Sequence, residues 1–142
     1  MTTEQNKANV KRFVEQILNT GQLDRMGEFF TPDFVDHART PGYPPGIEGT
    51  KQFFGELRAA FPDFHYTVDD SIADGDKVVQ RATGHGTMKG PFQGMPATGK
   101  HAMWSEIHTV RYGPSGKILE HWASIDQLGM LQQLGLAPTP GQ

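Results

Sequence analysis

The last third of the chain contains a carboxylate, a histidine and two tryptophans, residue types that are found together in proton-abstracting sites. Asp126 ends the segment EHWASID, which contains Trp122, and the segment before it carries Trp104 and His108. A carboxylate among apolar side chains loses hydration, which raises its pKa and makes it a stronger base. A protonated histidine or an indole N–H would stabilise an oxygen that becomes negative during a reaction by about 3 kcal/mol. These residue types are compatible with a pocket in which a carboxylate abstracts a proton from a bound molecule.

The elements that must position these residues are the two strands of a predicted hairpin, residues 101–112 and 117–126. In the turn YGPSGK, a proline suits a type I turn and Gly116 suits a bulge position with positive φ. We expect Gly113 to pair with Lys117, which sets the register. One sheet face then collects Trp104, Glu106, His108, Trp122, Ser124 and Asp126, and the other takes Ile107, Thr109, Leu119, His121, Ala123 and Ile125. The first face predicts a ligand pocket with apolar walls and a few polar groups.

Two alternative roles remain open for these residues. Asp126 directly precedes QLGMLQQL, so it also suits the N-cap of a final helix. His108 and His37 would serve equally as ordinary hydrogen-bonded residues, and tryptophans more often belong to a core than to a ligand pocket.

Three helices are predicted in the first half of the chain. Thr2 and Gln5 have capping-box spacing before the first helix. A shorter second helix ends at Pro32, and a third begins with Thr50 as its cap and ends at Pro62. Their apolar faces comprise Val10, Phe13, Val14, Ile17 and Leu18; then Leu23, Met26, Phe29 and Phe30; then Phe53, Phe54, Leu57 and Phe61.

The second half of the chain is predicted to be mostly sheet. Residues 64–72 and 77–86 flank the turn ADGD and form a first hairpin, while residues 36–49 and 89–100 are loops rich in Gly and Pro. The fold class is therefore α+β, with helices covering one face of a curved antiparallel sheet and a pocket between them. We expect residues 1–142 to form one domain.

Composition excludes several classes of function. The 142 residues contain 13 basic and 16 acidic side chains, giving a net charge of -3, and they are scattered rather than clustered. We therefore expect no nucleic-acid or membrane partner. Cysteine is absent, and the N-terminus lacks the apolar segment of a signal peptide, so we expect a cytoplasmic protein.

Two apparent motifs lack residues that their chemistry needs. The segment GMPATGK, residues 94–100, has phosphate-loop spacing, but His101 replaces the required Ser or Thr and a strand follows instead of a helix. The histidines at positions 37, 65, 85, 101, 108 and 121 include no pair at short metal-binding spacing. We predict no metal site and no cofactor.

Four segments in order resemble a known family: TPDFVDHA, GTKQFFGELRAAFPDF, IADGDKVVQRATGHGTMKGPFQGMPATGK and GKILEHWASIDQLGMLQQLG. Together they look like the SnoaL-like polyketide cyclases of the nuclear transport factor two-like superfamily, over nearly the whole chain. The resemblance implies a cone of curved antiparallel sheet wrapped by three N-terminal helices, a cystatin-like α+β barrel that encloses a pocket.

The resemblance also implies an activity and site residues. An acid near the end of the last long strand is the family's general base for intramolecular aldol ring closure, and Asp126 has that position. His108 is the second expected catalytic residue. His37, Trp104, Trp122 and Phe53 are expected to bind the substrate. Where the family often has GTHTG, this chain has GTMKG at residues 86–90, so one polar pocket group is expected to be missing.

Three functions are compatible with these residues and with the resemblance. The first is a cofactor-free cyclase acting on a small hydrophobic or polycarbonyl molecule. The second is a non-catalytic protein that binds a hydrophobic molecule in its cavity. The third is isomerase chemistry of the ketosteroid type, or epoxide hydrolysis, although Arg111 falls on the wrong face for the latter. By resemblance, the protein is expected to form a homodimer or a higher homo-oligomer.

Overall fold

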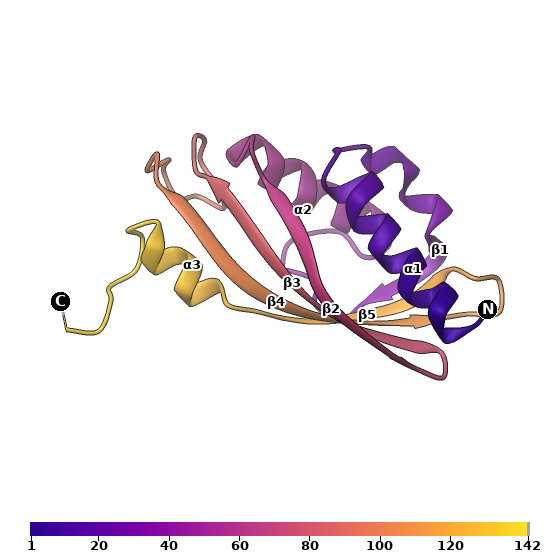
Figure 1. Ribbon diagram of the computed structural model, residues 1–142. Coiled ribbons are helices and arrows are strands. Elements are labelled where there is room, and N and C mark those ends of the chain that lie inside the picture. Colours follow the sequence, from indigo (N-terminus) through magenta and orange to yellow (C-terminus); the bar gives the residue numbers. More distant parts are fainter. Residues whose placement is uncertain (142) are drawn as a thin grey trace.

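A five-stranded curved sheet forms the body of the molecule in the computed structural model, which describes residues 1–141 (Figure 1). The strands are β1 (Phe30–Asp36), β2 (His65–Asp74), β3 (Lys77–Thr87), β4 (His101–Tyr112) and β5 (Ile118–Ile125). Their order across the sheet is β1-β5-β4-β3-β2. The predicted α+β class with a curved sheet and N-terminal helices is confirmed.

Strand β1 departs from the sequence-based expectation of a helix end and a loop in this region. It pairs with β5 in parallel, so the sheet is antiparallel only across β2 to β5. Pro32 does not end a helix but lies inside this strand. Because β1 is an edge strand, the N–H that proline lacks is not needed to join two neighbouring strands.

The helices are α1 (Thr3–Phe13) with a π-helical continuation (Val14–Leu18), a 3-10 helix (Leu23–Glu28), α2 (Gly46–Ala60) and α3 (Gln127–Gln133). The Thr2 and Gln5 capping box of α1 is confirmed, with hydrogen bonds of 2.8 and 3.1 Å. The second predicted helix is a 3-10 helix. α2 begins four residues before Thr50, at Gly46, with Pro45 as its N-cap.

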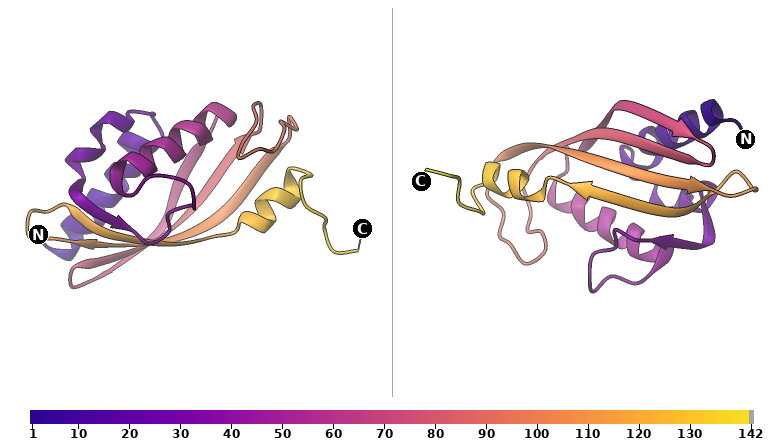
Figure 2. Two further views of the ribbon diagram at one scale, coloured as in Figure 1. Left: turned by 180° about the vertical axis from the view of Figure 1, so that it is seen from behind. Right: turned by 90° about the horizontal axis from the view of Figure 1, so that it is seen from below.

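The helices α1 and α2 lie together on one face of the sheet (Figures 1 and 2). When the sheet is viewed from its other face, both helices lie behind it, and α3 continues from the end of β5 (Figure 2). Gln133 of α3 exchanges two hydrogen bonds, of 2.7 and 2.8 Å, with the backbone of Met103 in β4. Across residues 1–141, no helix has the length and apolar character needed to span a membrane.

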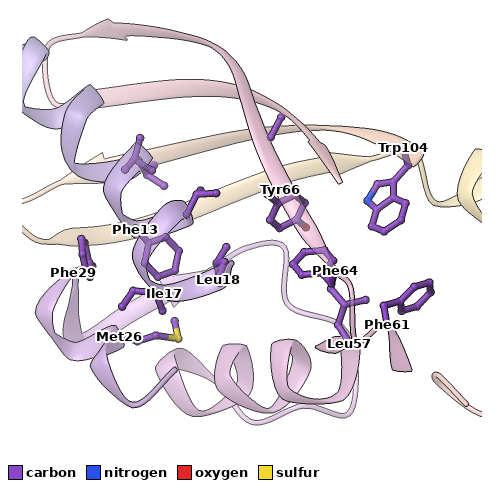
Figure 3. Close-up of a cluster of buried hydrophobic side chains, with 14 of the residues drawn as sticks. Phe13, Ile17, Leu18, Met26, Phe29, Leu57, Phe61, Phe64, Tyr66 and Trp104 are labelled. Atoms are coloured by element: carbon purple, nitrogen blue, oxygen red, sulfur yellow. The ribbon is translucent and has the colours of Figure 1, made fainter. Parts of the chain in front are cut away.

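Aromatic side chains fill the space between the helices and the sheet (Figure 3). Phe13 of α1 packs against Phe29 and Phe30, with ring centroids 5.4 and 4.9 Å apart. Towards the other end, Phe64 packs edge-to-face against Tyr66 at 4.6 Å. The core is one cluster in which these aromatic rings pack together with aliphatic side chains such as Ile17, Leu57 and Ile118.

The second hairpin contains a β-bulge that changes which residues face inward. Gly113 pairs with Lys117 as predicted, with an N–O distance of 2.9 Å. Tyr112 then pairs with Ile118, but Arg111 pairs with Glu120, so Leu119 is an extra residue in β5.

Beyond the bulge the predicted register is wrong by one residue. His108 lies opposite Ala123 instead of Trp122, and Asp126 donates its backbone N–H to Ser105 instead of facing Trp104. Because side chains alternate along a strand, a one-residue shift exchanges the two faces of β5. The predicted outward residues His121, Ala123 and Ile125 therefore point inward, whereas Trp122, Ser124 and Asp126 do not.

Candidate active site

A cavity lies between the inner face of the sheet, the helices α1 and α2, and the loop that follows β1. The space that the centre of a water-sized sphere can occupy is about 120 Å³, and the whole hollow, counted together with open solvent at its mouth, is about 1040 Å³. Most of its wall is apolar and includes Val10, Phe13, Phe34, Phe53, Phe54 and Ile125. An apolar wall with a few polar groups is typical of a site for a small, largely apolar ligand.

Four polar side chains of the cavity wall form one continuous hydrogen-bonded chain. Asp36 Oδ1 lies 2.8 Å from His121 Nδ1, and His121 Nε2 lies 2.8 Å from His108 Nδ1. His108 Nε2 lies 2.7 Å from Glu106 Oε1. Two neighbouring imidazoles are thus held between two carboxylates. We call His108 and His121 the histidine pair.

The Glu106 end of this chain is buried and fully hydrogen-bonded. Its Oε2 accepts from the Tyr66 hydroxyl and from Trp104 Nε1, each at 2.6 Å, and the residue is 2% exposed. Burial alone would raise the pKa of this carboxyl, but the hydrogen bond and charge of His108, with the two further donors, outweigh it and lower the pKa. Burial and the Glu106 charge together raise the pKa of Tyr66 well above its usual range. Glu106 is therefore an anion, and Tyr66 keeps its proton.

Backbone geometry makes room for the Trp104 donor. Gly84 of β3 lies directly opposite Trp104, and a Cβ atom at Gly84 would lie 2.8 Å from the indole ring. A larger residue at this position would have to displace the ring from Glu106.

The Asp36 end is less deeply buried, with the Asp36 side chain 13% exposed against 2% for Glu106. Asp36 Oδ1 also accepts from the backbone N–H of Ala38 at 2.9 Å, and Oδ2 receives a long contact of 3.5 Å from Thr50 Oγ1. Burial raises the pKa of the Asp36 carboxyl, but the hydrogen bond and charge of His121, followed by the other two donors, give a net lowering. The loop after β1 and the start of α2 thus hold this carboxylate in place.

The two carboxylates indicate which ring nitrogens of the histidine pair carry protons. His121 Nδ1 and His108 Nε2 each face a carboxylate oxygen, so each carries a proton. The contact between the two inner nitrogens needs one further proton. The geometry therefore corresponds to three protons on two imidazoles, or one positive charge between two negative carboxylates. Without the inner proton both imidazoles are neutral, and their inner lone pairs face each other across the 2.8 Å contact.

The predicted site residues are divided between the cavity and the outside. His108 and Phe53 line the cavity. Trp104 is buried beside it and supports Glu106 instead of facing the empty space. Asp126 is exposed, and its side chain accepts from Gly129 N at 2.9 Å as the N-cap of α3. The capping alternative for Asp126 is confirmed.

The prediction that His37 and Trp122 line the pocket is wrong. Their rings stack on one another at 4.8 Å on the outer face of the sheet, and His37 Nε2 contacts Glu120 at 2.8 Å. The cause is alternation: His37 and Trp122 each follow a residue, Asp36 and His121, that points inward.

Sequence reasoning missed Asp36, His121, Tyr66 and Gln80 as cavity residues. Asp36 was missed because its strand was expected to be a loop, and His121 because Leu119 forms a bulge. The DHA segment did carry a usable signal, since its aspartate adjoins the histidine that was expected to bind the substrate. Within residues 1–141, no three His, Cys, Asp or Glu side chains converge as metal ligands would.

Comparison with known proteins agrees with this architecture. The SnoaL-like polyketide cyclase family matches residues 8–134. Aklanonic acid methyl ester cyclase DnrD of Streptomyces peucetius is 32% identical over 139 residues, covering 92% of each chain. Among solved structures, TsrD of Streptomyces laurentii has a TM-score of 0.86 at 26% identity, covering 96% of this chain and 99% of TsrD. IdmH of Streptomyces antibioticus has a TM-score of 0.79 at 32% identity, covering 92% of this chain and 99% of IdmH. The chain therefore belongs to the SnoaL-like polyketide cyclase family, and its function is of the cyclase type.

Proposed function

We propose that this protein catalyses intramolecular aldol ring closure of a polyketide-like polycarbonyl molecule, with the histidine pair as the group that moves the proton. The observation that carries the proposal is the continuous chain from Asp36 through His121 and His108 to Glu106. Imidazole exchanges protons near neutral pH, and a carboxylate at each outer nitrogen fixes which nitrogens keep theirs. The relative DnrD, a cyclase of aklanonic acid methyl ester, supports a substrate of this class.

The reaction begins from the two-proton state of the pair. The outer nitrogens keep their protons in hydrogen bonds to Asp36 and Glu106, so the lone pairs lie on the inner nitrogens of His121 and His108, and one ring turns away from the other to direct its lone pair to the substrate. A carbon flanked by two carbonyl groups gives its proton to one of them, and the enolate attacks a second carbonyl carbon of the same molecule. As the carbon–carbon bond forms, the attacked oxygen takes the proton back from the pair. The reaction is a balanced isomerisation that consumes no other reactant.

The surroundings of the pair favour this step in two ways. In the three-proton state the pair carries a positive charge beside the enolate, which stabilises it where water is scarce. The apolar wall around Phe13, Phe34 and Phe53 favours a folded-back substrate, which brings the two reacting carbons together. Both imidazoles remain partly accessible, with side-chain exposures of 18% for His108 and 19% for His121.

The experiment that tests the proposal measures proton exchange and ring closure separately. Aklanonic acid methyl ester is incubated with the protein in deuterated water, and exchange at its activated carbon and formation of the cyclic product are followed by NMR. We expect His108→Gln to abolish both while the circular-dichroism spectrum is kept. Full exchange by His108→Gln would refute the role of the pair.

The matched control is Asp126→Asn, which removes the charge of the residue that the family resemblance favours as base. Asparagine is also a good N-cap, so this variant keeps α3. We expect its exchange and cyclisation rates to stay within about twofold of the starting protein, because Asp126 lies outside the cavity. Loss of exchange in Asp126→Asn alone would instead favour Asp126 as the base.

One observation favours a second candidate, a non-catalytic protein that binds a hydrophobic molecule. All four ring nitrogens of the histidine pair already have partners, so the pair needs no ligand to satisfy it. This alternative expects ligand affinity without turnover of any activated carbonyl compound, and ligand affinity unchanged in both His108→Gln and Asp126→Asn.

A further inference from the structure

We infer that the side-chain amide of Gln80 binds a carbonyl oxygen of the ligand and so positions the carbon next to it beside His108. The inference deepens the proposed function and rests on it for the identity of the ligand class. Binding of a carbonyl group by Gln80 does not itself require turnover, however, so the two proposals can fail separately.

Gln80 is a polar residue on the largely apolar inner face of β3. It lies in β3, between Val78 and Ala82, which are buried at 0% and 2% exposure on the same inner face. Gln80 itself is 3% exposed and lines the cavity. The side chain thus lies between apolar neighbours of its own strand and forms part of the cavity wall.

The Gln80 amide nitrogen finds no hydrogen-bond partner among the described residues. An unpaired buried amide is destabilising, because it has lost water without gaining a replacement. An apolar side chain of similar shape at this position would avoid that cost. A bound ligand with an acceptor atom supplies the missing partner.

The surrounding charge favours a neutral carbonyl oxygen as this acceptor. The carboxylates of Asp36 and Glu106 give the adjoining hydrogen-bonded chain a net negative charge even when the histidine pair carries its third proton. A carboxylate or phosphate group of a ligand would be repelled there. A ketone or ester carbonyl accepts the amide hydrogen bond without adding charge.

The register of the sheet places a carbonyl group bound by Gln80 close to the histidine pair. Gln80 lies directly opposite His108 across β3 and β4. Side chains of directly opposed residues on one face start about 5 Å apart at their Cβ atoms. A carbonyl held by Gln80 therefore puts its neighbouring, acidified carbon within reach of the histidine pair. Gln80 is in this sense a positioning residue and a determinant of which ligands are accepted.

The test uses two probes that differ only in the carbonyl group, 1-acetylnaphthalene and 1-ethylnaphthalene. Their dissociation constants are measured by ligand-observed NMR titration for the starting protein and for Gln80→Met, which has nearly the same shape without the amide. The ratio of the two constants is compared between proteins, so differences in ligand hydration cancel. We expect Gln80→Met to lower the preference for the ketone by about five- to tenfold while its affinity for 1-ethylnaphthalene is kept. An unchanged ratio would overturn the inference.

A second measurement separates a ligand-binding role from a structural one. Because the Gln80 amide is unpaired, we expect Gln80→Met and Gln80→Leu to unfold at the same or a higher temperature than the starting protein. Gln133 is the matched control, since its amide makes both of its hydrogen bonds to Met103. Gln133→Met should unfold at a lower temperature. A large drop in Tm for both Gln80 variants would show that Gln80 supports the fold and would count against the inference.

Turnover distinguishes failure of this inference from failure of the proposed function. If the starting protein prefers the ketone through Gln80 but exchanges no carbon-bound proton of aklanonic acid methyl ester, the inference stands and the cyclase mechanism falls. If proton exchange proceeds through the histidine pair but Gln80→Met leaves both the ligand ratio and KM unchanged, the mechanism stands and the inference falls.

Discussion

Strands β1 and β5 hold two carboxylate–imidazole pairs, one on each face of the sheet. Asp36 and His121 form the inner pair, and His37 and Glu120 form the outer pair, each with an N–O distance of 2.8 Å. Asp36 ends β1 and His37 directly follows it, while Glu120 and His121 are consecutive in β5, so alternation sends one pair inward and one outward. Since the contact distances are equal, any difference in role must come from the surroundings.

Those surroundings differ in burial and in what each pair touches next. The inner side chains are 13% and 19% exposed, and His121 continues into His108 and the cavity. The outer side chains are 41% and 23% exposed, and Glu120 also binds the guanidinium of Arg111 at 2.7 Å. The outer pair is a solvated ion cluster whose net contribution is small. The comparison teaches that a histidine next to a carboxylate indicates a site only where it faces ligand space.

The largest expected effect comes from removing one histidine from each face. His121→Gln breaks the hydrogen-bonded chain between Asp36 and His108, so we expect cyclisation to slow by about 10²- to 10⁴-fold. His37→Gln removes the outer histidine and should change the rate by less than about threefold. Steady-state rates with aklanonic acid methyl ester measure both, and equal losses in the two variants would erase the distinction between the faces.

Replacing Glu106 on the inner face and Glu120 on the outer face should have different effects on the stability of the fold and on its pH dependence. Glu106→Gln leaves His108, Tyr66 and Trp104 without their common anion, and we expect a loss of about 3 kcal/mol in the free energy of unfolding at pH 7. Glu120→Gln, on the outer face, should have a far smaller effect. Denaturant unfolding at pH 7 checks both values.

The pH dependence of the same variants follows from the lowered pKa of Glu106. A carboxyl whose folded-state pKa lies below its ordinary value of 4.5 stabilises the fold above that pH, and the stabilisation is lost as pH falls through the folded-state pKa. Unfolding free energies measured below about pH 5 should therefore fall less steeply with decreasing pH in Glu106→Gln than in the starting protein. Parallel curves would show that Glu106 is not held as an anion.

A smaller loss of stability is expected from a change at Gly84, where the backbone of β3 packs closely against the Trp104 ring. Gly84→Ala brings a methyl group against the Trp104 ring, so we expect a loss of about 1 to 3 kcal/mol and weaker support of Glu106. Gly55→Ala is the control, because a Cβ atom at Gly55 in α2 meets nothing within 4 Å. That change should stabilise the protein by up to about 1 kcal/mol. Thermal unfolding of both variants, followed by intrinsic tryptophan fluorescence, tests the contrast.

Much of the fold was predictable from local sequence patterns. Which residues of β5 point into the cavity was not. Capping and apolar periodicity predicted α1, and the Gly75 turn predicted the β2–β3 hairpin. Strand β1 was missed because its stability comes from pairing with β5, far along the sequence, while its own Pro32 suggested a helix end.

The candidate site emerged from the sequence only in part, for two geometric reasons. Asp36 ends strand β1, which pairs with a strand far along the chain and was expected to be a loop. The turn between β4 and β5 was predicted correctly at Gly113 and Lys117, but one bulged residue, Leu119, exchanged the faces of the strand beyond it. A bulge of this kind leaves no composition signal, since Leu fits either face. His108, on the strand without the bulge, was for that reason predicted to lie in the cavity while His121 was not.

The smallest expected effect concerns Asp126, which lies outside the cavity at the start of α3. Asp126→Ala removes the hydrogen bond to Gly129 N and should lower the free energy of unfolding by about 1 kcal/mol, the usual cost of losing an N-cap. Because the histidine pair is untouched, the cyclisation rate of the folded protein should stay within about twofold. Denaturant unfolding and steady-state kinetics are measured on the same preparation. A large loss of rate without a loss of stability would reverse the assignment, giving the base to the end of β5 and leaving the histidine pair a structural role.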